Sequence, residues 1–268
     1  MKKLTAFYFT GTGNTRYVTL ALLQRLSEQF ETRAFEIPGK FDAAAELKRA
    51  DVVLLAFPIY GSSPPVPMRQ FLQRNAELFR GKEVMIAATQ YMFSGDGAAS
   101  LGRAVQRIGG RVTFAEHFNM PNNLADCGMF RIRNGAELEK ILKKTDRKIE
   151  RFARRIVRGK RLRRGFNPVS HAVGYFCQRS FWRRSEDEKK SLLKIDAKRC
   201  IGCGLCVKSC PVQNLGMDGK RARAKGNCAL CYRCVNLCPK QAISLVGGRA
   251  PEVQYRGPHS GENQIFRE

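Results

Sequence analysis

The stretch Lys3–Thr15, KLTAFYFTGTGNT, joins a short apolar run to a loop of small and hydroxyl-bearing residues. The run Lys3–Phe9 predicts a strand, and helical spacing over Asn14–Phe30 predicts the helix that follows. In an open parallel α/β sheet, ligands bind beyond the carboxyl ends of the strands, which is where Thr10–Thr15 lies. Small residues let the backbone wrap a phosphate, while Thr hydroxyls and N–H groups at the helix N-terminus supply donors. The stretch therefore predicts an α/β fold with a phosphate-binding loop.

Four more strand signals follow in the first half of the chain, and helical segments separate them. The clearest is Asp51–Phe57 (DVVLLAF), whose apolar interior predicts a strand buried on both faces. Further strands are expected at Thr32–Ile37, Glu83–Thr89 and Arg111–Asn119, and further helices at Val66–Phe79, Ala98–Ile108 and Ala136–Arg158. Alternating strands and helices imply right-handed crossovers, so we predict a five-stranded parallel sheet covered on both faces.

The loop Thr10–Thr15 lacks the signatures of two common nucleotide sites. Arg16 stands where a dinucleotide-binding loop has its third glycine, and no Gly-Lys-Ser/Thr is present as in NTPases. Two interpretations stay open: the loop holds the phosphate of another cofactor, or it is a plain strand–helix connection.

The length, composition and charge of the chain limit the classes of protein to which it can belong. The 268 residues suffice for one large or two modest domains, and a hydrophobic share of 43% excludes a wholly disordered chain. No apolar run approaches the roughly 18 residues that a membrane-spanning helix needs. The net charge is +25, and residues 131–198 carry 22 basic but only 8 acidic side chains. We do not expect a nucleic acid partner, because no recognised nucleic-acid-binding module accompanies this charge.

Eight of the ten cysteines form two copies of one pattern, C-x2-C-x2-C-x3-C-P. The copies comprise Cys200, Cys203, Cys206 and Cys210, followed by Pro211, and then Cys228, Cys231, Cys234 and Cys238, followed by Pro239. In a chain without an export signal, such thiols favour metal or redox use over a disulfide framework. Iron in a [4Fe–4S] cube needs one thiolate at each corner, and three closely spaced cysteines on a tight loop can hold three corners.

In bacterial runs of this pattern the fourth cysteine binds the cluster of the other run. By that rule one cluster is held by Cys200, Cys203, Cys206 and Cys238, and the other by Cys228, Cys231, Cys234 and Cys210. A zinc ribbon is the alternative, since C-x2-C pairs also bind zinc. Zinc explains neither the third cysteine of each run nor the proline after the last, so we favour iron–sulfur clusters. Cys127 and Cys177 have no partner at a comparable spacing.

The run Thr10-Gly11-Thr12-Gly13-Asn14-Thr15 resembles the FMN phosphate loop of flavodoxins, and the resemblance extends over roughly the first 155 residues. It implies a flavodoxin-like fold and an FMN cofactor. Two more loops at strand ends, Phe57–Ser62 and Thr89–Gly95, would then flank the isoalloxazine ring. Besides Thr10–Thr15, the implied FMN-binding residues are Pro58, Tyr60, Gly61, Gln90, Tyr91, Phe93 and Gly95, of which the three aromatics are candidates for stacking on the ring.

The C-terminal part resembles the bacterial two-cluster ferredoxins, which implies a small α+β domain. It departs from the compact members by a longer basic loop, Val212–Asn227, where a partner could dock. A flavodoxin-like domain joined to such a module resembles the flavodoxin–ferredoxin fusion proteins of the EFR1 family. We accordingly expect a flavodoxin-like domain at 1–158, a basic connector at 159–189, a ferredoxin domain at 190–248 and a C-terminal tail at 249–268.

The basic connector interleaves aromatic side chains with arginines and belongs to neither expected domain. Three interpretations stay open. It can be a linker that packs on both modules, a contact with an anionic membrane surface, or a docking surface for an acidic redox partner.

The combined pattern predicts an electron-transfer protein that relays electrons between FMN, two [4Fe–4S] clusters and an acidic redox partner. FMN exchanges one or two electrons and each cluster one, so no side chain is expected to act as an acid or a nucleophile. One alternative is an FMN-dependent reductase fed by its own clusters, and another is a redox sensor or nucleic-acid-binding protein with structural clusters. We expect a cytoplasmic protein, with peripheral membrane contact as an open alternative.

Overall fold

The computed structural model describes residues 1–258, and these divide into two compact units. The first unit comprises Met1–Thr10, Asn14–Met120 and Ile141–Arg183. The second comprises Gly11–Gly13, Pro121–Lys140 and the chain from Arg184 onward. Half of the tail predicted at 249–268 lies outside the described residues, which end at Pro258.

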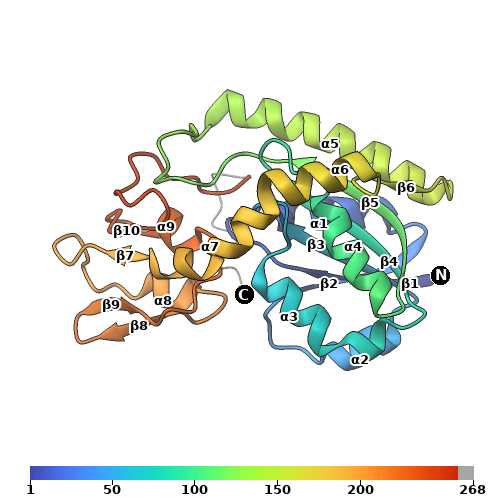
Figure 1. The fold of residues 1–268 in the computed structure, drawn as a ribbon, viewed down its shortest axis with the longest axis horizontal. Coiled ribbons are helices and arrows are strands. Elements are labelled where there is room, and N and C mark those ends of the chain that lie inside the picture. The colour runs from blue at the N-terminus through green and yellow to red at the C-terminus, as the bar shows by residue number, and fades with distance from the viewer. Residues whose placement is uncertain (259–268) are drawn as a thin grey trace. The chain divides into compact units, whose positions relative to one another are not determined.

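A six-stranded parallel sheet forms the centre of the first unit, in the order β2-β1-β3-β4-β5-β6 (Figure 1). The strands are β1 (Lys2–Tyr8), β2 (Phe30–Glu36), β3 (Val52–Pro58), β4 (Glu83–Gln90), β5 (Arg111–Asn119) and β6 (Leu162–Arg163). The order of the first five strands is that of flavodoxin-like sheets, in which the ligand binds at the switch point between β1 and β3. The predicted α/β fold with a parallel sheet is confirmed.

The sheet has one strand more than the five that were predicted. β6 pairs with β5 in parallel, Leu162 opposite Phe114 and Arg163 opposite Ala115. Only two residues of the basic connector form this strand, and two residues are too few to show a strand periodicity. The prediction of five strands is therefore wrong by this short edge strand.

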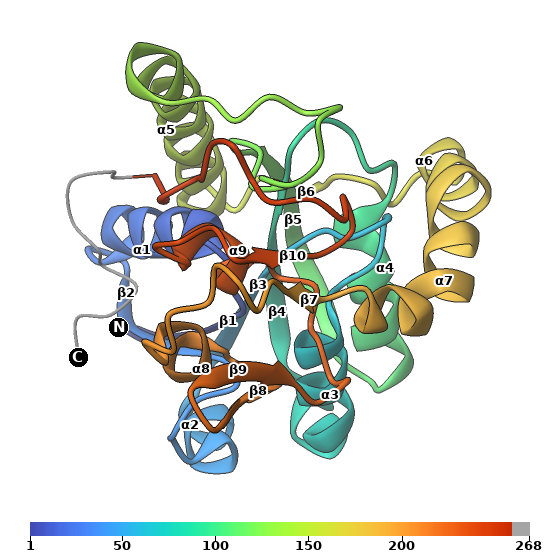
Figure 2. The ribbon, with the colours of Figure 1, turned by 90° about the vertical axis from the view of Figure 1, so that its left-hand side faces the viewer.

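Helices cover both faces of the sheet (Figure 2). They are α1 (Asn14–Leu26), α2 (Ala43–Arg49), α3 (Val66–Arg74), the 3-10 helix η1 (Ala76–Phe79), α4 (Gly97–Arg107), α5 (Gly135–Val157), α6 (Pro168–Ala172), the π-helix η2 (Val173–Arg179) and α7 (Ser180–Ser191). α1 and α5 lie side by side, since the Tyr17 hydroxyl donates to Asp146 at 2.7 Å. α3 and α4 lie on the opposite face (Figure 2). Among the described helices, none is long and apolar enough to cross a membrane.

The centre of the sheet is apolar on both faces, as the sequence of β3 predicts. Val53, Leu54 and Leu55 are successive residues of β3 and are all fully buried. Because successive strand residues point to opposite faces, both faces of this strand need a cover. The helices on the two sides supply it and hold the strand ends, where the predicted loops lie, on a rigid base.

The basic connector belongs to the first unit as far as Arg183. Its α6 and η2 pack against the start of α4, where the N-cap residue Asp96 is fully buried. Asp96 accepts hydrogen bonds from Arg103 and Arg179, and His171 Nδ1 lies 2.9 Å from its Oδ2. Arg179 is itself buried, which lowers its pKa, while the charge of Asp96 opposes that shift. A buried carboxylate is tolerated only with such partners, so the connector and α4 depend on each other.

The second unit contains two small antiparallel sheets and two short helices. β7 (Lys194–Ile195) pairs with β10 (Ile243–Ser244), and β8 (Leu215–Asp218) pairs with β9 (Arg221–Ala224). The helices are α8 (Leu205–Ser209) and α9 (Arg233–Leu237). The hairpin β8–β9 occupies the long basic loop predicted between the cysteine runs. This small domain of strands and helices agrees with the predicted α+β fold.

A buried histidine links the pH to the stability of the first unit. His117 on β5 accepts a hydrogen bond at Nε2 from the backbone N–H of Ala98, at the start of α4, at 2.9 Å. Burial, assisted by the charge of Lys148, lowers the pKa of His117 to about 4. The unfolded chain binds a proton here below about pH 6.5, whereas the folded protein binds it only below about pH 4. Stability from the neutral ring is therefore complete above about pH 6.5 and is lost as the pH falls towards 4.

We predict that this group lowers the free energy of unfolding by up to about 3 kcal/mol between pH 7 and pH 4. Urea unfolding followed by circular dichroism at a series of pH values measures this slope. The variant His117→Gln should be less stable at pH 7 but should lose most of the dependence in this window. Equal slopes for the variant and the wild type would contradict the role of His117.

Candidate cofactor sites

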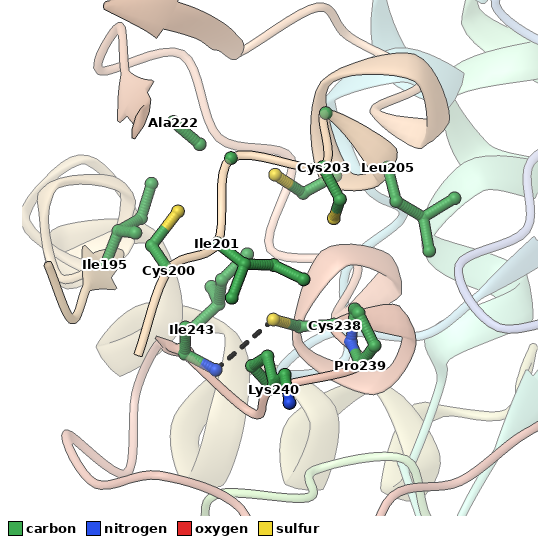
Figure 3. A pocket seen from close by; sticks show the side chains of 14 residues that line it. Ile195, Cys200, Ile201, Cys203, Leu205, Ala222, Cys238, Pro239, Lys240 and Ile243 are labelled. Carbon is green, nitrogen blue, oxygen red and sulfur yellow. Dashed lines mark hydrogen bonds between the residues drawn. The ribbon is translucent and has the colours of Figure 1, made fainter. Parts of the chain in front are cut away.

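Four cysteines from two segments of the chain line one cavity of the second unit (Figure 3). The lining residues are Ile195, Cys200, Ile201, Gly202, Cys203, Gly204, Leu205, Cys206, Ala222, Cys238, Pro239, Lys240, Ala242 and Ile243. The four thiols are those predicted to share one cluster, with Cys238 contributed by the second run. Apart from Lys240, the other side chains of the lining are apolar.

The other four cysteines form a second group. Burial, together with the neighbouring Cys231 and Cys210, raises the pKa of the Cys228 thiol to about 12. Burial also raises the pKa values of Cys231 and Cys234, and Cys210 again adds to both. In the first group, burial raises the pKa of Cys206 to about 11, with contributions from Cys238, Cys203 and Cys200. The structure thus brings each fourth cysteine to the three thiols of the other run.

Backbone N–H groups donate hydrogen bonds to sulfur atoms in both groups of thiols. The N–H of Asn214 donates to Cys210 Sγ, and that of Ala242 donates to Cys238 Sγ, both at 3.2 Å (Figure 3 shows the second). These two bonds occupy equivalent places in the two runs, four residues after the fourth cysteine. Hydrogen bonds to the sulfurs are one of the means by which proteins set the potential of an iron–sulfur cluster.

The two runs share their backbone conformation as well as their spacing. Gly202 and Gly204 have φ angles of +70°, and the equivalent residues of the second run, Leu230 and Tyr232, have φ angles of +55° and +61°. Glycine adopts this left-handed conformation freely, whereas other residues pay about 1–2 kcal/mol each. The second run keeps the same shape without glycine, which indicates that the surrounding structure holds it there.

The residues present fit a four-iron cube at each group. Each group offers four thiols. Four of the eight are buried, and burial raises their pKa values, which favours their protonated form in the absence of iron: Cys206, Cys228, Cys231 and Cys234. Binding of iron replaces those protons and removes the repulsion between neighbouring thiolates. Residues 1–258 contain no cluster of three His, Cys, Asp or Glu side chains arranged around a single metal ion. A cube does not require one, because its ligands bind different irons.

The two thiol groups differ in exposure. Cys203 of the first group is exposed and its neighbour Ile201 is 60% exposed, whereas Cys228, Cys231 and Cys234 of the second group are buried. The first site therefore lies nearer the surface than the second. Cys127 is half-buried and Cys177 is exposed, and no contact with either thiol group is recorded among the described residues.

Arg233 is a residue near the second thiol group that the sequence analysis missed. Its side chain is buried, and in the sequence it stands between Cys231 and Cys234. Its positive charge lowers the pKa of Cys231, but burial of this thiol raises the pKa by more. Its Nε donates to the Gly11 carbonyl at 2.8 Å, and its Nη1 to the Ser209 carbonyl at 3.3 Å. A buried cation beside a cluster favours the reduced state, in which the cluster carries more negative charge. Its position inside a C-x2-C spacing was the available signal.

The predicted phosphate loop falls in both units. Thr10 and Thr15 are buried residues of the first unit, and Thr15 Oγ1 lies 2.8 Å from Thr89 Oγ1 at the end of β4. Gly11–Gly13 belong to the second unit, where Asn123 Nδ2 donates to Thr12 Oγ1 at 3.1 Å. Asn14 begins α1, so the loop does precede a helix N-terminus as predicted.

The other two predicted FMN loops meet in the first unit. Pro58 ends β3 and Gln90 ends β4, and the loops that follow are joined by the Ser62 hydroxyl, which donates to the Ser94 carbonyl at 2.5 Å. Gly61 and Gly95 have positive φ angles, +51° and +57°. The three aromatic residues predicted to stack on the ring differ in exposure: Phe93 is 63% exposed, whereas Tyr60 and Tyr91 are half-buried.

The first unit also contains one buried hydroxyl group that fits a polar ligand at the ends of the strands. Within the part of the chain that the structure describes, the fully buried Ser63 Oγ has no hydrogen-bond partner. Ser63 lies on the turn after β3, where Tyr60 and Ser63 exchange backbone hydrogen bonds at 2.9 Å. An unsatisfied buried hydroxyl at the switch point of the sheet fits the binding of a polar ligand group there.

The two glycines of the first cysteine run give a matched pair for mutation. A Cβ on Gly202 would overlap the Lys220 carbonyl oxygen at the β8–β9 turn, whereas a Cβ on Gly204 would meet nothing within 4 Å. Both have φ +70°, so the backbone strain of an alanine, about 1–2 kcal/mol, is common to both. We predict that Gly204→Ala keeps nearly all of its iron, while Gly202→Ala loses iron and melts at a lower temperature. Iron analysis after anaerobic reconstitution tests this, and equal losses in the two variants would contradict the packing of Gly202 on the hairpin.

Comparison with known proteins identifies part of the chain. Residues 199–242 match a family model described as "4Fe-4S dicluster domain", and this range contains all eight cysteines of the two runs. The segment is thus similar to 4Fe–4S dicluster domains, which agrees with the interpretation of the cysteine spacing. A search of the curated proteins finds no match for the chain.

Among solved structures, several flavodoxins are similar to the chain. The Bacillus cereus flavodoxin 1 is 16% identical, with a TM-score of 0.43 over 59% of this chain and 98% of that one. A flavodoxin from the domain Archaea is 16% identical, with a TM-score of 0.42 over 58% and 99% of the two chains. The two-electron reduced flavodoxin of Megasphaera elsdenii is 19% identical, with a TM-score of 0.39 over 42% and 84%. The flavodoxin-like fold of the first unit follows from its strand order, β2-β1-β3-β4-β5.

Proposed function

We propose that this chain is an electron-transfer protein that holds FMN and two [4Fe–4S] clusters and relays electrons between them and a redox partner. The observation that carries the proposal is the exchange of fourth cysteines. Cys238 joins Cys200, Cys203 and Cys206 around one apolar cavity, and Cys210 joins the thiols of the second run. The 4Fe–4S dicluster match at residues 199–242 and the strand order of the first unit support it.

Each set of residues has a binding role in this proposal. The eight thiolates hold the clusters, and the N–H groups of Asn214 and Ala242 stabilise charge on two of them. The loop Thr10–Thr15 holds the FMN phosphate, and the loops at Pro58–Gly61 and Gln90–Gly95 hold the flavin ring. When bound, FMN supplies one- and two-electron exchange and each cluster supplies one-electron exchange. The side chains bind, insulate and tune these groups, and none transfers a proton to a substrate. This combination supports placing the chain with the flavodoxin–ferredoxin fusions of the EFR1 family.

An acidic partner fits the surface at the mouth of the first cavity. The exposed Ile201 and Cys203 lie there, and the exposed Lys240 lines the same cavity. The hairpin β8–β9 adds the exposed Lys220 and Arg221 beside the buried Ala222, which also lines the cavity. An apolar centre bordered by cations attracts an acidic protein and steers it towards the more exposed cluster site.

The ligand sets predict the outcome of single cysteine substitutions. The intact protein should contain about eight irons, and Cys238→Ser or Cys210→Ser should each lower this to about four. The two variants should retain different clusters and therefore differ in their EPR spectra after reduction. Cys177→Ser is the control, because this exposed thiol belongs to neither group, and it should keep about eight irons. About two metal atoms without sulfide in the wild type would contradict the cluster assignment and favour zinc.

The charge at the cavity mouth predicts how fast anions exchange electrons with the protein. We expect Lys220→Glu/Lys240→Glu to slow oxidation of the reduced protein by ferricyanide several-fold at low salt, because the attraction is removed. The control Lys143→Glu/Lys144→Glu changes the net charge equally, at exposed residues of α5. Stopped-flow rates measure both. If the two double variants slow the reaction equally, only the net charge matters and the proposed surface is wrong.

A further inference from the structure

The connector contacts both of the loops to which the proposed function assigns the flavin ring. We propose that Gln178 and Trp182 of the connector complete the FMN site: Gln178 positions the two loops, and Trp182 contacts the bound flavin. The inference rests on the proposed FMN function and assigns a role to a segment beyond the sheet and its strand-end loops.

Gln178, in the π-helix η2, bridges the two loops with one amide group. Its Nε2 donates to the Phe93 carbonyl at 3.1 Å, and its Oε1 lies 2.9 Å from the Ser62 hydroxyl, whose one proton it shares with the Ser94 carbonyl. Ser62 is fully buried, so the second bond is shielded from water. Ser62 and Phe93 lie in the two loops predicted to flank the ring, and the amide therefore sets the distance between these loops.

The neighbouring Arg179 fixes the bridge in place. Its Nε donates to the Ser62 carbonyl at 3.1 Å, while its Nη2 binds the buried Asp96, which follows the second loop directly. Gly95 and Gly174 leave no space between loop and π-helix, because a Cβ on Gly95 would meet the backbone of Gly174 at 2.7 Å. The connector cannot move here without moving both loops. A π-helical turn is rare and occurs frequently at functional sites, which agrees with such a constraint.

Trp182, in α7, lies directly against the first loop. A Cβ on Gly61 would overlap the Trp182 side chain, and the rings of Tyr60 and Trp182 have centroids 6.1 Å apart at an angle of 46°. Tyr60 and Gly61 are both predicted FMN residues, so a ring bound by them comes within reach of the indole. Offset or tilted stacking of aromatic rings at such distances is favourable. The geometry therefore assigns Trp182 to the wall of the flavin site.

The chain contains a single tryptophan, which gives a direct test on the unaltered protein. We expect FMN, added anaerobically to the full chain with its clusters but stripped of flavin, to quench the Trp182 emission. The midpoint of this quenching should equal that for loss of FMN fluorescence. Quenching by the clusters is constant through the titration and forms the baseline.

Three variants test the two roles by the FMN dissociation constant. Trp182→Ala and Gln178→Ala should each weaken binding about tenfold, and Trp182→Phe should recover part of the loss. Phe176→Ala is the matched control, an aromatic of the same π-helix that is 69% exposed, and it should stay within about twofold of the wild type. In Gln178→Ala the indole should still be quenched by bound FMN, since only the positioning bridge is removed.

Failure of the role proposed for Trp182 can be distinguished from failure of the proposed FMN function. If the wild type binds FMN tightly without quenching Trp182, and Trp182→Ala binds it equally well, the inference is wrong and the proposed function stands. If the wild type with both clusters present binds no FMN, the flavin half of the proposed function is wrong and the inference fails with it.

Discussion

The exchange of the fourth cysteine between the two runs is the constraint on which the second unit depends. Cys238 must reach the cavity of Cys200, Cys203 and Cys206, and Cys210 must reach the thiols of the second run. Each group of four thiols therefore takes residues from both cysteine runs. The short strands β7 and β10 pair at Ile195 and Ile243, which both line the first cavity, so this small sheet forms part of its wall. So few regular elements make a small core, and we infer that bound iron supplies much of the stability of this unit.

In the first unit, the buried carboxylate of Asp96 joins segments that are far apart in the sequence. Asp96 follows the loop Thr89–Gly95, caps α4, accepts a hydrogen bond from Arg179 and lies next to His171 of the connector. A long-range ion pair thus attaches the basic segment to the sheet instead of leaving it as a free linker. Part of the high positive charge of this chain is accounted for in this way, since Arg103 and Arg179 neutralise a buried anion. The same segment also contains two exposed aromatic side chains, Phe176 and Phe181.

The sequence predicted those parts of the molecule that depend on local patterns. A buried strand lies at the predicted Asp51–Phe57, and a helix follows the loop Thr10–Thr15, because apolar runs carry this information. The fixed cysteine spacings likewise predict the two ligand sets. Other features depend on tertiary contacts. Leu230 and Tyr232 adopt left-handed conformations that their residue types do not favour. β6 is too short for a periodic signal, and Gln178 meets Ser62 and Phe93 only after folding. Aromatic and arginine residues in the connector fit a packed linker, a membrane contact and a docking surface for an acidic partner equally well. The sequence alone therefore did not distinguish these three interpretations.

An anaerobic reductive titration of the full chain tests the central claim most directly. With two one-electron clusters and one two-electron flavin, the protein should take up about four electron equivalents. Flavin absorbance and cluster EPR signals should account for about two equivalents each. Uptake of about two equivalents or fewer, with either spectroscopic component missing, would contradict a chain that unites a flavin with two clusters.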